Sequence, residues 1–245
     1  MFRRALTRGV ACCLPALLVI GCGGNGKHTD LPPAPAAPNT LTDAERHAGW
    51  QLLFDGTTTT GWHTYGKQDV QGWVAKDGML YRTSAVGDLV SDEQFDSFEL
   101  TLQWKLGEKG NSGIFWWANE GTAVIYENAP EMQVLDNIGH RDGLSPLTSA
   151  GALYGLSPAP ATLVKPLGEW NTVRILTHGG RVELWLNGVQ TADANFDSKE
   201  LKDKIAASKF KQWVTYGKSR RGRIGLQEHE SPVWYRNIKL REFVK

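Results

Sequence analysis

Short segments of alternating apolar and polar residues, separated by turn residues, run through most of this chain and constrain its fold. Residues 98–106 alternate throughout, and successive side chains of a strand point to opposite faces, so one face of this segment should be buried. Lys76-Asp77-Gly78 and Asn187-Gly188 each join two such segments, as tight hairpin turns do. Many short strands with frequent turns indicate an all-β sandwich or barrel.

The helical pattern is weak by comparison. Residues 196–209 are the best candidate, with Asp197 as the N-terminal cap and Glu200 three residues later. Residues 41–245 make up about 200 residues, which is a normal size for one all-β domain. We therefore expect a single all-β domain with one minor helix.

The first residues resemble the secretion signal of a bacterial lipoprotein. Arginines within residues 3–8 precede an apolar run at residues 10–20, which is too short to span a bilayer as a helix. The run ends in Leu18-Val19-Ile20-Gly21-Cys22, which is similar to a lipobox, where cleavage leaves Cys22 as a lipidated N-terminus. We expect residues 1–21 to be removed. A single transmembrane anchor is the alternative that the short run disfavours.

Residues 22–40 are rich in glycine, proline and alanine, a composition that cannot bury a core and that favours an extended tether. The folded domain would then comprise residues 41–245. Gly23 rather than an aspartate follows Cys22, so the resemblance to lipoproteins implies an exported protein anchored by lipid. In an organism with an outer membrane, the domain would be held there, facing the periplasm.

Cysteine and charge counts exclude several kinds of site. The cysteines at positions 12, 13 and 22 all precede the domain, which therefore has no disulfide, thiolate nucleophile or cysteine-ligated zinc. Without the three arginines of residues 1–21, the chain has 24 basic and 26 acidic residues, a formal net charge of −2. This balance does not suggest a nucleic-acid partner.

One predicted strand and the loop after it concentrate polar side chains. Glu131 and Gln133 share one strand face, and apolar residues alternate with them on the other. Asp136 and His140 follow just beyond the strand end. Carboxylate, amide and imidazole groups this close together suit proton transfer, sugar binding or metal ligation. A solvated strand face and a histidine bonded to the loop backbone are the simpler alternatives.

A second polar set lies near the C-terminus. Alternation places Gly225, Gln227 and His229 on one strand face, with Ile224 and Leu226 in the core. A glycine at position 225 would leave room for a ligand close to the backbone. A charged strand end is the simpler alternative for His229.

The chain has 10 tryptophans, and most should lie in the core because a buried aromatic ring contributes so much apolar area. Trp116 and Trp117 are adjacent in a predicted strand, so one should enter the core while the other lines a groove. We assign Trp116 to substrate binding, since an indole face fits the apolar face of a pyranose. Lys165 precedes a proline at a loop, either on the surface or in contact with substrate.

A series of motifs in fixed order spans residues 49–243. They are Leu53-Phe54-Asp55-Gly56 with Gly61-Trp62, Asp96-Ser97-Phe98-Glu99-Leu100, Gly110-Asn111-Ser112-Gly113-Ile114-Phe115, Glu131-Met132-Gln133-Val134-Leu135-Asp136 with His140 and Asp142, Gly168-Glu169-Trp170-Asn171, Trp185-Leu186-Asn187-Gly188, Gly225-Leu226-Gln227-Glu228-His229 and Arg236-Asn237-Ile238-Lys239. The series resembles the 3-keto-disaccharide hydrolase family. The resemblance implies a concanavalin A-like jelly roll of two curved antiparallel sheets. It also implies a carbohydrate-active enzyme that acts on 3-keto-glycosides as a 1,2-lyase and a 2-hydroxy-glucal hydratase.

The implied reaction begins at C2 of a 3-keto-glucoside, whose hydrogen is acidic because the carbanion delocalises into the ketone. Proton removal, β-elimination of the C1 substituent and addition of water give net hydrolysis, and they require a base, an enolate stabiliser and an acid. We assign Glu131, His140 and His229 to acid–base catalysis, and Gln133 and Gln227 to binding sugar hydroxyls.

A divalent metal is a possible cofactor of the implied reaction, as the enolate stabiliser. Asp136 and His140 would hold the metal, or Asp136 would instead orient His140. No HxH or HExxH spacing supports a metal site.

Two other functions use similar residues. A non-catalytic, lectin-like carbohydrate-binding lipoprotein would tolerate loss of Glu131, His140 and His229 with small changes in affinity, whereas an enzyme would lose turnover. A glycanase of the same fold needs two carboxylates flanking one bond, and Gln133 interrupts such a pattern. The sequence does not specify the sugar, the linkage, the leaving group, the balance of lyase and hydratase activity, or the oligomeric state.

Overall fold

The computed structural model of the chain describes residues 37–243. The predicted signal peptide at residues 1–21, the lipidation site Cys22 and the tether up to residue 36 lie outside the described residues. Asn39, which the sequence assigns to the tether, is buried: its side-chain amide donates to the carbonyl of Gly78, and its Oδ1 accepts from the backbone N–H of Asn237. Ordered contacts therefore begin before residue 41.

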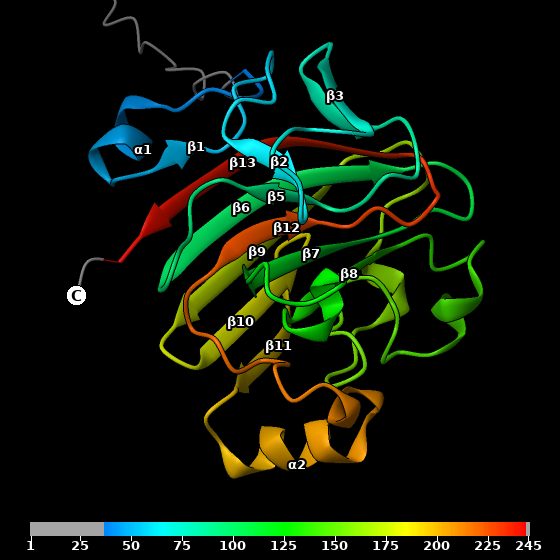
Figure 1. Cartoon of the computed structure of the whole chain (residues 1–245). Coiled ribbons are helices and arrows are strands. Elements are labelled where there is room, and N and C mark those ends of the chain that lie inside the picture. The colour runs from blue at the N-terminus through cyan, green and yellow to red at the C-terminus, as the bar shows by residue number, and fades with distance from the viewer. Residues whose placement is uncertain (1–36, 244–245) are drawn as a thin grey trace, which may run out of the picture. The chain divides into compact units, whose positions relative to one another are not determined.

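Two antiparallel sheets form the domain (Figure 1). The first has the order β11-β10-β9-β6-β13-β4-β3, with β1 paired to β13, and the second has the order β2-β5-β12-β7-β8. The strands of the first sheet are β1 (Gln51–Leu52), β3 (Trp73–Lys76), β4 (Met79–Arg82), β6 (Phe98–Leu106), β9 (Asn171–His178), β10 (Arg181–Leu186), β11 (Val189–Asn195) and β13 (Val233–Glu242). Those of the second are β2 (Trp62–Thr64), β5 (Leu89–Ser91), β7 (Asn111–Ala118), β8 (Glu131–Leu135) and β12 (Arg223–Leu226). The all-β prediction is confirmed.

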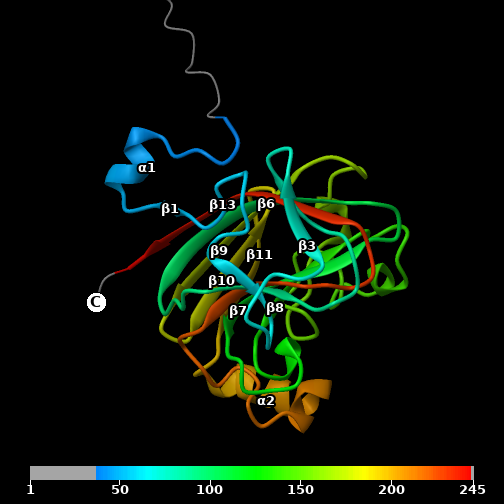
Figure 2. The ribbon, with the colours of Figure 1, turned by 45° about the horizontal axis from the view of Figure 1, so that its top comes forward.

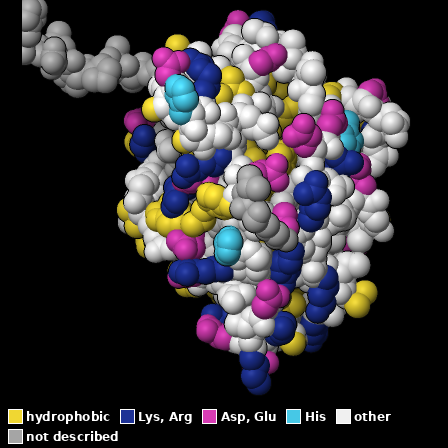
Figure 3. All heavy atoms as spheres, turned by 90° about the vertical axis from the view of Figure 1, so that its left-hand side faces the viewer, with side chains coloured by type: hydrophobic (Ala, Val, Ile, Leu, Met, Phe, Trp, Pro, Cys, Tyr) yellow, Lys and Arg dark blue, Asp and Glu magenta, His cyan; other side chains and the backbone are white. Residues whose placement is uncertain are grey.

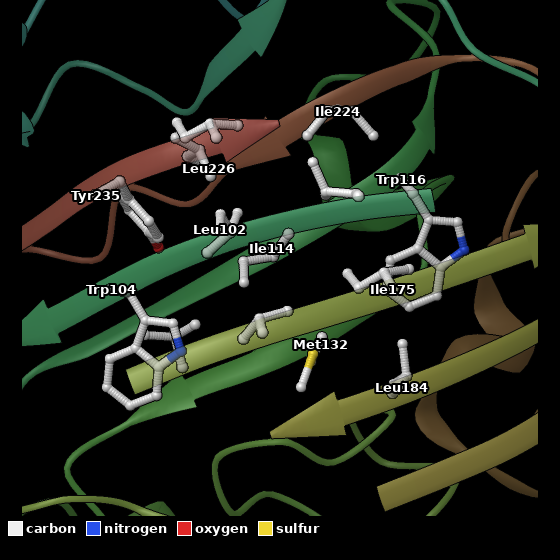
Figure 4. Close-up of a cluster of buried hydrophobic side chains, with 14 of the residues drawn as sticks. Leu102, Trp104, Ile114, Trp116, Met132, Ile175, Leu184, Ile224, Leu226 and Tyr235 are labelled. Carbon is white, nitrogen blue, oxygen red and sulfur yellow. The ribbon is translucent and has the colours of Figure 1, made fainter. Parts of the chain in front are cut away.

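The hydrophobic core lies between the sheets and is built from alternate residues of each strand (Figure 4). Leu102 and Trp104 of β6 enter it from one sheet, and Ile114 of β7 with Met132 of β8 enter it from the other. All four side chains are almost completely buried. Because side chains alternate, the intervening residues of β7 and β8 face away from the core, and the candidate site lies on that outer face.

The predicted hairpin turns are confirmed by the backbone. Asp77 and Gly78 join β3 to β4 with φ of 53° and 73°, and Asn187 and Gly188 join β10 to β11 with φ of 51° and 85°. Two consecutive residues with positive φ match the right-handed twist of the strands, and asparagine, aspartate and glycine adopt this conformation at least cost.

The two α-helices within residues 37–243 lie outside the sheets, at opposite ends of the domain (Figure 2). They are α1 (Asp43–His47) and α2 (Lys199–Ala207). The predicted helix at residues 196–209 is thus shorter than expected, and its cap was wrongly assigned to Asp197. Ser198 caps α2 by accepting from the N–H of Leu201, while the Asp197 carboxylate binds the Arg220 guanidinium at 2.8 Å. No helix among residues 37–243 is long and apolar enough to cross a membrane.

The prediction that Trp116 lines a groove is wrong. Trp116 and Trp117 are 0% and 1% exposed, and their rings meet edge to face within the same core at 6.4 Å. The pairing of β7 with β12 shifts in register here, and Trp117 has a φ of 55°. This irregularity is a β-bulge, which breaks the alternation that would have turned one of the two rings outward.

The surface of the domain is mixed in charge. On the face shown in Figure 3, Lys and Arg side chains are interspersed with Asp and Glu, and no broad area carries one sign alone. Exposed ion pairs of the domain include Arg181 with Asp193 at 2.7 Å and Lys204 with Glu200 at 2.8 Å. Exposed pairs contribute little to stability.

Candidate active site

A cavity of about 290 Å³ opens on the outer face of the second sheet, over β7 and β8. Four of the predicted site residues line it together: Glu131 and Gln133 of β8, and Gln227 and His229 after β12. The strand expected to reach His229 ends at Leu226, and yet Ile224 and Leu226 are in the core as predicted. The alternation of side chains in two segments far apart in the sequence therefore predicted residues that line the same cavity.

Glu131 is the central acidic group of this cavity. It is 7% exposed. Burial raises the pKa of Glu131 from 4.5 to about 8; the Lys209 ammonium opposes this shift, and the Asp88 and Asp142 carboxylates add to it. A carboxyl group with this pKa is mostly protonated at neutral pH and is a strong base once ionised.

Gly113 of β7 provides the space for Glu131. A Cβ atom at position 113 would lie 2.1 Å from Oε1 and 2.7 Å from Cδ of Glu131. The sequence assigned such a role to Gly225, but a Cβ there would meet the Cδ1 atom of Ile125 at 2.6 Å. The space beside Gly225 is thus filled by the protein itself, and the glycine that opens the site is Gly113.

Replacing Gly113 with alanine should therefore displace the Glu131 carboxylate. We expect the rate of a reaction that uses Glu131 to fall about 100-fold, because a small misplacement of a reacting group is costly. The free energy of unfolding should fall by about 1–2 kcal/mol, because the added methyl group overpacks the site. Gly121→Ala is the matched control, since no heavy atom lies within 4 Å of a Cβ there. Kinetics and thermal unfolding of both variants check this prediction; equal turnover in the two would contradict it.

Lys209 brings positive charge to the cavity from the segment after α2. Its Nζ lies 4.2 Å from the ring centroid of Tyr154, another lining residue. Partial burial lowers the pKa of Lys209, and the Glu131 and Asp142 carboxylates oppose that shift. Burial raises the pKa of Tyr154 to about 12, so its hydroxyl stays protonated and able to donate. The cavity therefore holds an acid–base group beside two potential donors to a developing oxyanion.

The loop that carries Gln227 and His229 is held by buried charges. The N–H of Glu228 donates to the Asp88 carboxylate at 2.8 Å, and the Glu228 carboxylate pairs with Arg82 at 2.6 Å. Burial raises the pKa of Asp88 to about 7, while the bond from Glu228 opposes that shift. The N–H of Gln227 also donates to the carbonyl of Gly113 at 2.9 Å, which ties the loop to the floor of the cavity.

His140 contacts His229 but is not among the residues that line the cavity. The two imidazole rings meet edge to face at 6.3 Å, and Nδ1 of His140 accepts from the N–H of Asp142 at 3.2 Å. Asp142 does line the cavity. His140 is therefore placed to support His229 and to position Asp142. The predicted catalytic role of His140 would require contact with substrate, but His140 does not line the cavity.

Asp136 does not fit the predicted roles of metal ligand or partner of His140. Its carboxylate accepts from the backbone N–H groups of Lys109, Ile138 and Gly139 at 2.8, 3.1 and 3.0 Å. These bonds use both oxygens to fold the loop after β8. Among residues 37–243, no three His, Cys, Asp or Glu side chains are grouped to hold a metal ion, and we derive no step through one.

Lys165 is exposed, which agrees with the surface alternative and not with substrate binding in this cavity. It lines a separate, more apolar cavity of about 530 Å³ at the end of the sandwich, and its ammonium donates to the carbonyl of Trp170 at 2.9 Å. Lys165 therefore does not join the groups around Glu131.

Several lining residues were missed from the sequence. They are Asn111, Tyr126, Asp142, Tyr154, Lys209, Phe210 and Trp213. Asn111 shares its strand face with Gly113, and parity would have placed it in the site. The others come from turns, 3₁₀ segments and loops that carry no periodic pattern, so only Asp142, which stands in a family motif, left a signal in the sequence.

Asn111 adds an unused acceptor to this cavity. Its side chain is 3% exposed, and no group among the described residues donates to its Oδ1. A buried polar atom without a partner costs free energy, so this position suits a donor supplied by a ligand hydroxyl.

The sequence of the whole domain matches known proteins. The profile of the family described as a 3-keto-alpha-glucoside-1,2-lyase-like domain matches residues 49–241. A curated 3-keto-disaccharide hydrolase from Bacteroides thetaiotaomicron is 32% identical over 280 aligned positions, which cover 95% of this chain and 97% of that protein.

Solved structures share the fold. A Parabacteroides distasonis chain, provisionally named a glycosyl hydrolase, superposes with a TM-score of 0.81 at 30% identity, covering 85% of this chain and 100% of its own. A Bacillus subtilis protein of unknown function with a galectin-like fold superposes with a TM-score of 0.51 at 15% identity, covering 85% of this chain and 96% of its own. The second likeness concerns the fold alone. The predicted jelly-roll sandwich is confirmed.

Proposed function

Because this chain belongs to the family of 3-keto-alpha-glucoside-1,2-lyase-like domains, we propose that its cavity cleaves 3-keto-glycosides by elimination and hydration. The observation that carries the proposal is Glu131, a buried carboxyl group with a pKa raised to about 8, at the floor of a cavity that also holds Lys209 and His229. Perturbed acid–base groups that converge in a cavity are typical of catalytic sites.

In the first step, the Glu131 carboxylate takes the proton from C2 of the 3-keto sugar. The electrons of the C2–H bond move to the C3 oxygen, where negative charge develops. The Lys209 ammonium and the Tyr154 hydroxyl stabilise that oxygen, and no reorganisation of bulk water is needed in so small a cavity. A stronger base is required for a carbon acid than for a hydroxyl, which suits a carboxyl group with a raised pKa.

In the second step, the enolate electrons form the C1–C2 double bond and the bond from C1 to the leaving oxygen breaks. His229 gives that oxygen a proton and releases the alcohol. Water then adds to C1 of the enone and returns a proton to His229. Glu131 exchanges its proton with solvent and then protonates C2. The net change is hydrolysis with retention of the 3-keto group.

The purified full chain, incubated with 3-keto-trehalose and with methyl 3-keto-α- and β-glucosides, tests this function. We expect release of 3-keto-glucose or a 2-hydroxy-glucal, detected by mass spectrometry. In D₂O, cleavage through elimination places one deuterium at C2 of the product, whereas direct displacement at C1 places none. A sample without enzyme corrects for spontaneous exchange next to the ketone.

Two outcomes would lead to other conclusions. Binding of these sugars without turnover would overturn the enzyme proposal and favour a lectin-like role. Loss of turnover with EDTA, restored by a divalent ion, would establish the metal that remains a prediction from the family resemblance.

A further inference from the structure

Two aromatic residues stand where the cavity meets solvent. Tyr126 is 40% exposed, in contrast to Glu131 at 7%, and its ring lies 5.4 Å from that of the half-buried Trp213 at an angle of 58°. Both residues line the same cavity as Glu131. The cavity thus has a charged interior and an aromatic rim.

The rim is backed by rigid packing. The N–H of Trp213 donates to the carbonyl of Phe210 at 3.0 Å, and their rings lie 6.1 Å apart. Phe210, which is buried, stacks on the buried ring of Tyr216 at 4.0 Å and 14°. Trp213 therefore lies against core residues, and little conformational freedom is lost when a ligand covers it.

The two segments that provide the rim are also bound to each other. The hydroxyl of Thr215 donates to the carbonyl of Glu127 at 2.9 Å, and the N–H of Gly217 donates to the carbonyl of Asn128 at 2.9 Å. These bonds connect the residues next to Trp213 with those next to Tyr126. The pair is thus held in place before any ligand arrives.

We propose that Tyr126 and Trp213 form a second subsite, which takes the leaving-group sugar of a 3-keto-disaccharide. This inference rests on the proposed function and assigns Tyr126 and Trp213 to the recognition of a pyranose leaving group. The reacting ring needs Glu131, Lys209 and His229 around its ketone and C2. The second ring then lies toward solvent, where the apolar C–H face of a pyranose packs on an indole and a phenol.

Comparison of two substrates tests the subsite in the full chain. For Trp213→Ala, we expect kcat/KM to fall at least 10-fold with 3-keto-trehalose and less than threefold with methyl 3-keto-α-glucoside, which has no second ring. Trp213→Phe should restore most of the activity, because it keeps an aromatic face. Trp185→Ala is the matched control: Trp185 is half-buried on β10 under Arg174, away from the cavity, and should not change the ratio.

A binding measurement separates failure of the subsite from failure of the proposed function. By calorimetry, Trp213→Ala should weaken binding of trehalose relative to methyl α-glucoside, whether or not the wild-type protein turns over keto sugars. Absence of wild-type turnover, with this binding difference present, would overturn the reaction and support the subsite. Equal losses of affinity for methyl α-glucoside and trehalose, or no loss of affinity for either sugar, would overturn the subsite.

Discussion

Glu131→Gln is expected to lower the turnover of 3-keto-glycosides about 1,000-fold. The amide has nearly the shape of the carboxyl group but cannot accept the C2 proton, and a positioned general base typically contributes about 10²–10⁴-fold to rate. With removal of the C2 proton as the rate-limiting step, kcat/KM of the wild-type protein should rise with pH and level off above about pH 8, since the carboxylate form of Glu131 is the base and its pKa is raised to about 8. The variant should lose that limb of the profile.

Steady-state kinetics from pH 5.5 to about pH 9.5 check this prediction, together with deuterium incorporation at C2. Glu200→Gln is the matched control, because Glu200 is an exposed residue of α2 paired only with Lys204. If Glu131→Gln retained turnover within tenfold of the wild type, or still exchanged the C2 hydrogen at the wild-type rate, another residue would be the base.

The same substitution is expected to make the fold more stable at alkaline pH. Burial raises the pKa of Glu131 from 4.5 to about 8, so the folded state holds a proton that the unfolded chain has already lost. The stability that this proton contributes is complete below pH 4.5 and is lost as the pH rises through about 8. Between pH 6 and pH 9, this ionisation should cost the wild-type protein about 3 kcal/mol of unfolding free energy that the glutamine variant keeps.

Urea unfolding at pH 6, 7.5 and 9 measures the difference directly. Burial raises the pKa of Asp88 to about 7, so its ionisation should cause a similar loss of unfolding free energy at lower pH. That loss of unfolding free energy should persist in Glu131→Gln. Asp88→Asn would remove it, since asparagine keeps an acceptor for the N–H of Glu228. Parallel stability curves for the wild type and Glu131→Gln would show that Glu131 titrates normally, and would remove the support for it as a base with a raised pKa.

Stability and activity therefore make opposing demands on Glu131. A glutamine would suit the buried site better at every pH above 4.5, because it carries no charge to desolvate. The presence of a carboxyl group at this buried position is explained by its use as a base in the proposed reaction, at a cost in stability.

The failures of the sequence analysis have local physical causes. Trp116 was placed in a groove because strict alternation was assumed, and a bulge at Trp117 returns both rings to the core. Asp136 was read as a ligand because of its position beyond a strand, but short polar side chains in turns commonly bind nearby backbone N–H groups, as this one does. Ile125 fills the space beside Gly225, whereas the Glu131 carboxylate fills the space beside Gly113. These neighbours are distant in the sequence, so the sequence pattern does not predict them.

By itself, the sequence determined the sandwich fold, its hairpin turns, the family, and the face that carries Glu131, Gln133 and Gln227. These follow from alternation and turn chemistry, which are local properties of the chain. Only the tertiary structure decided that Lys209 and Trp213 join that face, because a segment without periodic pattern folds over it after α2. The raised pKa of Glu131 was likewise a tertiary result, since it depends on how much water the packed cavity excludes.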